Sequence, residues 1–179
     1  MKNLFGTVLI LTLAMCANLG HAASKQEIDA MIKETMSKFY KHSSAGKALA
    51  GKASGILVFP KVIKAGIGIG GEYGEGALLV GGKTSAYYAT AGASIGFQLG
   101  AQTKSQVILF MDQSSLNAFT HSEGWKVGVD GSVAIANFGA GGELDTKTLE
   151  QPVIGFIFSN KGLMYDLSLE GSKFTKISR

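Results

Sequence analysis

The chain has 179 residues, of which 46% are hydrophobic, and this length corresponds to one domain with enough apolar material for its own core. Its formal net charge at pH 7 is +4, but it contains only one arginine, Arg179. Because base readout in nucleic acids relies on bidentate arginine contacts, this composition argues against sequence-specific nucleic-acid binding.

The positive charge is concentrated in the amino-terminal part. Residues 24–64 contain eight lysines and three acidic residues, whereas residues 65–179 contain eight basic and ten acidic residues. This asymmetry indicates an anionic partner for the amino-terminal part. The alternative is that these lysines only solvate the outer faces of helices.

The first residues are typical of a bacterial export signal. Lys2 precedes the uncharged run NLFGTVLILTLAMCANLG, which is too short for a good transmembrane helix, and Gly20 and Ala22 suit cleavage after Ala22. We predict a signal peptide at residues 1–22 and a periplasmic, membrane-associated mature protein. The alternative is a lipid anchor at Cys16, because LAMC is close to a lipoprotein box. Cleavage after Ala22 would leave no cysteine for a disulfide or a thiolate metal site.

Residues 23–53 are expected to form an amino-terminal helical segment. Ser24 and Glu27 have the spacing of a capping box, which predicts a helix start. The apolar residues that follow recur at helical spacing: Ile28, Ile32, Met36 and Phe39. Such a basic amphipathic helix packs on the core, and it can also border a membrane-facing surface. The Ala-rich stretch SAGKALAGKA predicts a second, short helix.

Residues 54–179 are expected to form a glycine-rich β-domain. The runs GILVFP, SQVILFMD and QPVIGFIFSN are short and apolar, as in buried strands, and GGKT is typical of a hairpin turn with Lys83 at its tip. The exception is a short helix near residues 113–121, capped by Asp112 or a nearby serine. Glycine in strands permits sharp bends and close backbone approach. We predict an α+β, mainly β, fold: a strongly bent antiparallel sheet, small barrel or sandwich with one or two amino-terminal helices.

Two glycine patterns imitate nucleotide-binding motifs. Gly66, Gly68 and Gly71 spell G-x-G-x-x-G, and residues 77–84 read A-x-x-x-x-G-K-T. Both motifs need a helix directly afterwards, whose amino terminus receives the phosphate. Strand-like sequence follows in both cases, so we predict no nucleotide binding and assign the glycines to architecture.

No residue pattern supports catalysis. His42 and His121 lack partners at metal-ligand spacing, and Glu72 and Glu75 would lie on opposite faces of a regular strand. We therefore predict a non-enzymatic protein without catalytic residues, bound metal or cofactor.

Five segments in order resemble the SYLF domain family: GILVFPKVIKAGIGIGGEYGEGALL, YYATAGASIGFQLGAQ, VILFMDQSSLNAF, GWKVGVDGSVAI and GFIFSNKGLM. The resemblance spans roughly residues 45–177. It implies a glycine-rich β-fold with amino-terminal helices and binding of phosphoinositides or other acidic lipids through an amphipathic helix and a basic surface. It also implies actin binding in eukaryotic members, a partner not expected in a periplasm.

We therefore predict binding to acidic phospholipid or another anionic envelope lipid. The expected lipid-binding residues are Lys33, Lys38, Lys41, Lys47, Lys52, Lys61 and Lys64, with Met36 and Phe39 as apolar contacts. The alternative for Met36 and Phe39 is that both belong to the core. The alternative is a β-barrel-like carrier or structural envelope protein that holds a small apolar ligand in its interior or binds a protein partner.

Overall fold

The computed structural model describes residues 23–136, 145–159, 162–163, 169 and 171–179. The expected signal peptide, with Cys16, lies outside the described residues. The elements in chain order are α2 (Lys25–His42), α3 (Ser44–Ala50), β1 (Gly55–Val80), β2 (Lys83–Phe110), α4 (Gln113–His121), β3 (Trp125–Lys126), β4 (Ala134–Ile135), α5 (Thr146–Leu149), β5 (Val153–Ser159), β6 (Gly162–Leu163) and β7 (Lys173–Ile177).

The fold is built on one long antiparallel ribbon of two strands, β1 with 26 residues and β2 with 28. The strands are joined at Gly81 and Gly82, whose φ angles of 58° and 76° only glycine adopts readily. The hairpin turn predicted at GGKT is therefore confirmed. The prediction that Lys83 lies at its tip is wrong, because Lys83 pairs with Val80 and is the first residue of β2.

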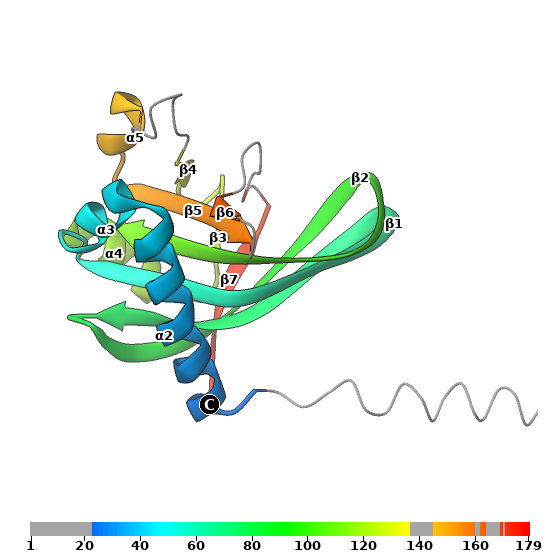
Figure 1. Ribbon diagram of the computed structural model, residues 1–179, viewed down its shortest axis with the longest axis horizontal. Coiled ribbons are helices and arrows are strands. Elements are labelled where there is room, and N and C mark those ends of the chain that lie inside the picture. Colours follow the sequence, from blue (N-terminus) through cyan, green and yellow to red (C-terminus); the bar gives the residue numbers. More distant parts are fainter. Residues whose placement is uncertain (1–22, 137–144, 160–161, 164–168, 170) are drawn as a thin grey trace, which may run out of the picture.

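The ribbon doubles back on itself so that the two halves of β1 cross (Figure 1). The strand register shifts between Phe59 and Val62 and again between Gly66 and Gly68. Where the halves meet, a Cβ on Gly76 would lie 1.9 Å from the carbonyl oxygen of Val58. No side chain fits at that distance, so the crossing is a contact of backbone with backbone.

The remaining strands extend this ribbon into one sheet. β2 pairs with β5 through residues 105–110 and with β7 through residues 87–91, and the sheet of the described residues has seven strands. The predicted class, α+β and mainly β with a strongly bent sheet, is confirmed. One detail of the prediction is wrong, because β4 pairs with β5 in parallel.

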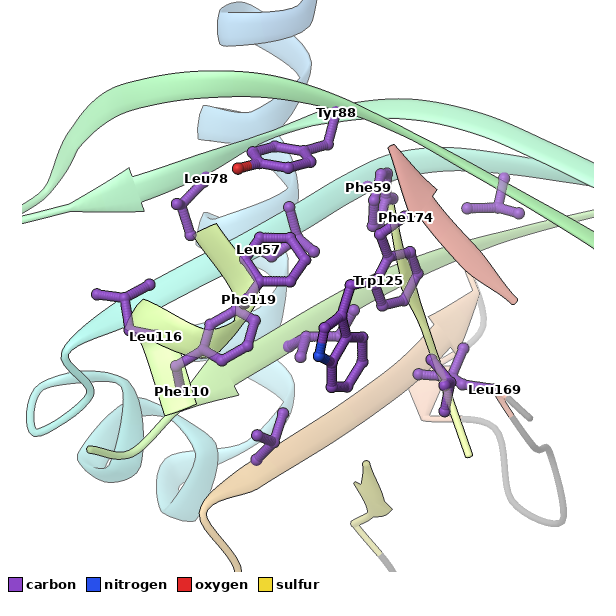
Figure 2. Packing of buried hydrophobic residues seen from close by; sticks show 14 of the residues in the cluster. Leu57, Phe59, Leu78, Tyr88, Phe110, Leu116, Phe119, Trp125, Leu169 and Phe174 are labelled. Carbon is purple, nitrogen blue, oxygen red and sulfur yellow. The ribbon is translucent and has the colours of Figure 1, made fainter. Parts of the chain in front are cut away.

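Both faces of the central strands are buried, which explains their continuous apolar runs. In β2, Ile108 and Phe110 point to the inner face of the bend, and Val107 and Leu109 point to the opposite face under α2. The inner face is filled with aromatic rings around Phe119 of α4 (Figure 2). The ring centroids of Phe119 and Phe110 are 4.8 Å apart.

The helix predicted near residues 113–121 is confirmed as α4. Asp112 caps it by accepting a 2.7 Å hydrogen bond from the Ser115 amide.

Polar side chains are also buried within the bend. The Lys104 ammonium lies 2.7 Å from a Glu72 carboxylate oxygen, and both side chains are only 7% exposed. The Ser172 hydroxyl donates to the same carboxylate at 3.1 Å. Glu75 instead pairs with Arg179, so the two glutamates have separate partners and do not form an acid/base pair.

We expect Gly76→Ala to destabilise the protein by roughly 1–3 kcal/mol or more, because the added methyl group overlaps the Val58 carbonyl and forces the crossing apart. Gly71→Ala is the matched control in the same strand, since its added Cβ would meet only the Gly92 carbonyl at an ordinary 3.7 Å. Urea unfolding of both variants measures the difference. Equal midpoints would contradict the role assigned to this crossing.

Candidate functional site

The two amino-terminal helices lie on the outer face of the sheet, as the amphipathic pattern indicates. The capping box is confirmed: the Ser24 amide donates to the Glu27 carboxylate at 2.7 Å, and the Glu27 amide donates to the Ser24 hydroxyl oxygen at 3.3 Å. The expected second helix is confirmed as α3, whose cap is the Ser43 side chain. Together α2 and α3 carry most of the residues predicted to bind lipid.

The structure separates the predicted site residues into exposed and buried ones. The five predicted lysines of the helical segment are exposed: Lys33, Lys38, Lys41, Lys47 and Lys52. Phe39 is fully buried, with its ring centroid 4.9 Å from that of Phe156, and therefore belongs to the core. The interpretation of Phe39 as an apolar lipid contact is corrected, because its ring is not accessible in this structure. Met36 is also mostly buried, at 7% exposure, but it borders the groove described below.

The predicted lysines do not lie on one face. Lys33 lines a groove on one side of α2. Lys38 and Lys61 line a separate hollow of about 270 Å³ on the other side. The Lys38 ammonium lies 2.7 Å from the Glu34 carboxylate, and its hydrogen bond and charge lower the pKa of Glu34. Lys64 lies further along β1 and is partly buried.

An open groove of about 750 Å³ lies between α2 and the hairpin end of the ribbon. We call it the α2 groove; the lining residues used below are Ile32, Lys33, Met36, Tyr40, Ile56 and Leu79. Tyr40 is 36% exposed, and Ile56 and Leu79 are half-buried, so apolar surface at this groove faces solvent. Its volume is within the range of about 300–1,000 Å³ that is usual for small-molecule sites.

A hydrogen-bonded clamp joins α2 to β2 at the same groove. The hydroxyl groups of Thr84 and Tyr87 each donate to the Asp29 carboxylate at 3.0 Å. Asp29 thereby has its own partners, and Lys33, one turn further along α2, makes no ion pair with any residue that the structure describes. Lys33 is therefore the available cation at the α2 groove.

Sequence reasoning missed the groove and the clamp because they combine residues more than fifty positions apart. Leu79 and Thr84 belong to the hairpin end, and only the folding of the ribbon places them beside α2. The carrier hypothesis placed a ligand inside the bent sheet. In the described residues, that interior is filled by packed side chains such as Phe59, Phe110 and Trp125 (Figure 2).

Neither a metal-type cluster nor a membrane-spanning helix occurs in the described part of the chain. His42 and His121 are both exposed, and no three His, Cys, Asp or Glu side chains there are grouped closely enough to hold a metal ion. None of the helices that the structure describes has the length and hydropathy needed to span a bilayer.

Comparison with known proteins identifies relatives of the β-domain. Residues 91–178 match the family model "Ysc84: Las17-binding protein actin regulator". The SH3 domain-containing YSC84-like protein 1 of Xenopus laevis is 31% identical over 126 residues, which are 68% of this chain and 37% of that protein. The chain thus spans little more than a third of that relative, and α2 and α3 lie outside the matched family model.

We expect Asp29→Asn to lower the pKa of Tyr87 toward its ordinary value. Burial raises that pKa most, and the hydrogen bond to Asp29 and the carboxylate charge raise it further, because a phenolate beside a carboxylate is disfavoured. The substitution removes the charge and leaves the burial unchanged. NMR titration of the tyrosine rings measures the shift, with Tyr88 as the internal control because burial alone raises its pKa. An unchanged Tyr87 titration would contradict the clamp.

Proposed function

Because this chain belongs to the SYLF (Ysc84) family of binding domains, we propose that it binds acidic lipid surfaces and catalyses no reaction. We place this activity in a bacterial cell envelope, where export would bring the protein to anionic phospholipid or lipopolysaccharide. The observation that carries the proposal is the cluster of exposed lysines on α2 and α3, beside an open apolar groove.

The charge distribution supports binding to a surface rather than to one small anion. The exposed lysines are spread along α2 and α3 and do not converge on one point, since Lys33 and Lys38 border different hollows; a planar membrane would attract them collectively. Each lysine near an anionic membrane contributes on the order of 1 kcal/mol, and the attraction decays within a Debye length of about 10 Å at 0.1 M salt. Binding should therefore be strong at low salt and weak at high salt.

The matched family model is described as a Las17-binding actin regulator, and this description concerns the family rather than this chain. The described residues that would meet a membrane belong mainly to α2 and α3, which the family model does not cover. The lipid proposal therefore depends on this chain's own helices and needs its own test.

Sedimentation with vesicles tests the proposal directly. We expect the mature domain to bind vesicles of phosphatidylglycerol and phosphatidylethanolamine more strongly as the anionic fraction rises, and to be released by salt. Equal binding to neutral vesicles at high salt, or no binding at all, would refute it.

We expect the triple variant Lys33→Glu, Lys38→Glu and Lys41→Glu to lose vesicle binding by roughly 100-fold or more, because three contributions of about 1 kcal/mol are removed and reversed. The fold should persist, since exposed charges contribute little to stability. The matched control reverses three exposed lysines of the β-domain: Lys126, Lys147 and Lys176. Co-sedimentation and circular dichroism measure binding and folding, and equal binding by the two variants would show that α2 is not the contact.

We expect Glu34→Gln to strengthen binding to anionic vesicles by about 2- to 5-fold at low salt, because it removes the carboxylate that pairs with Lys38 and frees that cation. Glu123→Gln, an exposed carboxylate outside the helical segment, is the charge-matched control. The gain should disappear at high salt. If both variants bind alike, Lys38 does not take part.

A further inference from the structure

We propose that the α2 groove is a binding site for one fatty acid, with the acyl chain along the apolar lining and the carboxylate at Lys33. This site shares Lys33 with the bilayer contact proposed above, but the inference does not rest on that contact. A fatty acid would bind from solution at one molecule per protein, whether or not the protein also binds a membrane.

The lining of the groove suits a flexible apolar chain. Ile32 and Met36 project from α2, and Ile56 and Leu79 project from the facing halves of β1. Neither Ile56 nor Leu79 is fully covered, although their neighbours in β1, Leu57 and Leu78, are buried. Burying such apolar surface is favourable by about 25 cal/mol per Å², and an acyl chain would supply the missing cover.

The groove keeps its width because α2 is anchored in the core and the hairpin end is tied to α2. Ile28 and Phe39 pack α2 into the core, and the Asp29 carboxylate of α2 accepts hydrogen bonds from Thr84 and Tyr87 of β2. At the hairpin end Gly82 contributes no side chain to the lining. A preformed site of this kind loses little conformational entropy when a ligand enters.

The charges at the groove select an anionic head group. Lys33 lines the groove and has no acidic partner in the described part of the chain, while the Asp29 carboxylate already accepts two hydrogen bonds. Lys83 is exposed between Gly82 and Thr84, which both line the groove, and adds positive charge at its hairpin end. A carboxylate can therefore pair with Lys33 at the edge of water while the chain occupies the apolar part.

Filling the groove with a larger side chain tests the site proposed for the acyl chain. Laurate, kept below its micellar concentration, should bind the mature domain at one per protein by isothermal titration calorimetry and native mass spectrometry. Leu79→Trp places an indole in the groove and should weaken binding by at least about 10-fold, because the chain and the indole compete for one space. Val80→Trp is the matched control, since Val80 is the next residue of β1, is 41% exposed and does not line the groove.

Removing the charge tests the head-group site. Lys33→Gln should weaken laurate binding by roughly 3- to 10-fold and leave the binding of uncharged dodecanol unchanged, because only the carboxylate meets the lysine. Lys41→Gln, also exposed on α2 but outside the groove lining, should bind both ligands as the unmodified protein does.

The outcomes separate this inference from the proposed function. Leu79→Trp should still sediment with anionic vesicles, because its lysines are intact. Failure of the unmodified protein to bind laurate, or equal laurate binding by Leu79→Trp and Val80→Trp when both are folded, would overturn the fatty-acid site. If the unmodified protein binds laurate but does not sediment with anionic vesicles, only the membrane proposal is overturned.

Discussion

The backbone contact between Gly76 and Val58 is the constraint on which the rest of the structure depends. It lets the first and second halves of β1 cross at a distance that excludes any side chain. A Cβ on Gly74 would likewise overlap the Lys61 carbonyl oxygen, at 2.6 Å. The crossing folds a ribbon of more than fifty residues into a bent sheet and gives that sheet an inner and an outer face. The inner face closes around Phe119 of α4, and the outer face receives α2. A larger residue at the crossing would separate the layers on which both cores rest.

The same crossing determines what surface the helices can offer. Because α2 must cover the outer core, its apolar stripe is used in packing, and Phe39 is unavailable to any ligand. What remains for recognition is the charged outer side of the helix and the line where α2 meets the hairpin. Side chains do not completely fill the space between α2 and the hairpin end. The α2 groove therefore lies where the helix and the curved sheet do not pack closely together.

Buried polar groups show that the inside of the bend is more than an apolar core. The Glu72–Lys104 pair, with Ser172, connects β1, β2 and the segment that leads into β7. Such a pair contributes little net stability after desolvation, but losing one partner leaves a buried charge without compensation. The side-chain amide of Gln106, by contrast, has no hydrogen-bond partner among the described residues. The inner face therefore tolerates a polar interior at one end, while Phe110, Phe119 and their neighbours fill the other.

The sequence by itself determined local features of the fold, because these follow from the chemistry of neighbouring residues. That β1 continues through Pro60 to Val80, and that α5 forms, did not follow from the sequence. The Ser24–Glu27 box, the Asp112 cap, the Gly81–Gly82 turn and the apolar runs of β1, β2 and β5 each involve neighbouring residues. The sequence also contains, in order, the five segments that resemble the SYLF family. Only the tertiary structure decided which apolar residues of α2 are core, that Lys33 and Lys38 border different hollows, and that Leu79 and Thr84 meet α2. Those facts depend on where the ribbon crosses itself, and helical or strand periodicity contains no information about a contact between residues fifty positions apart.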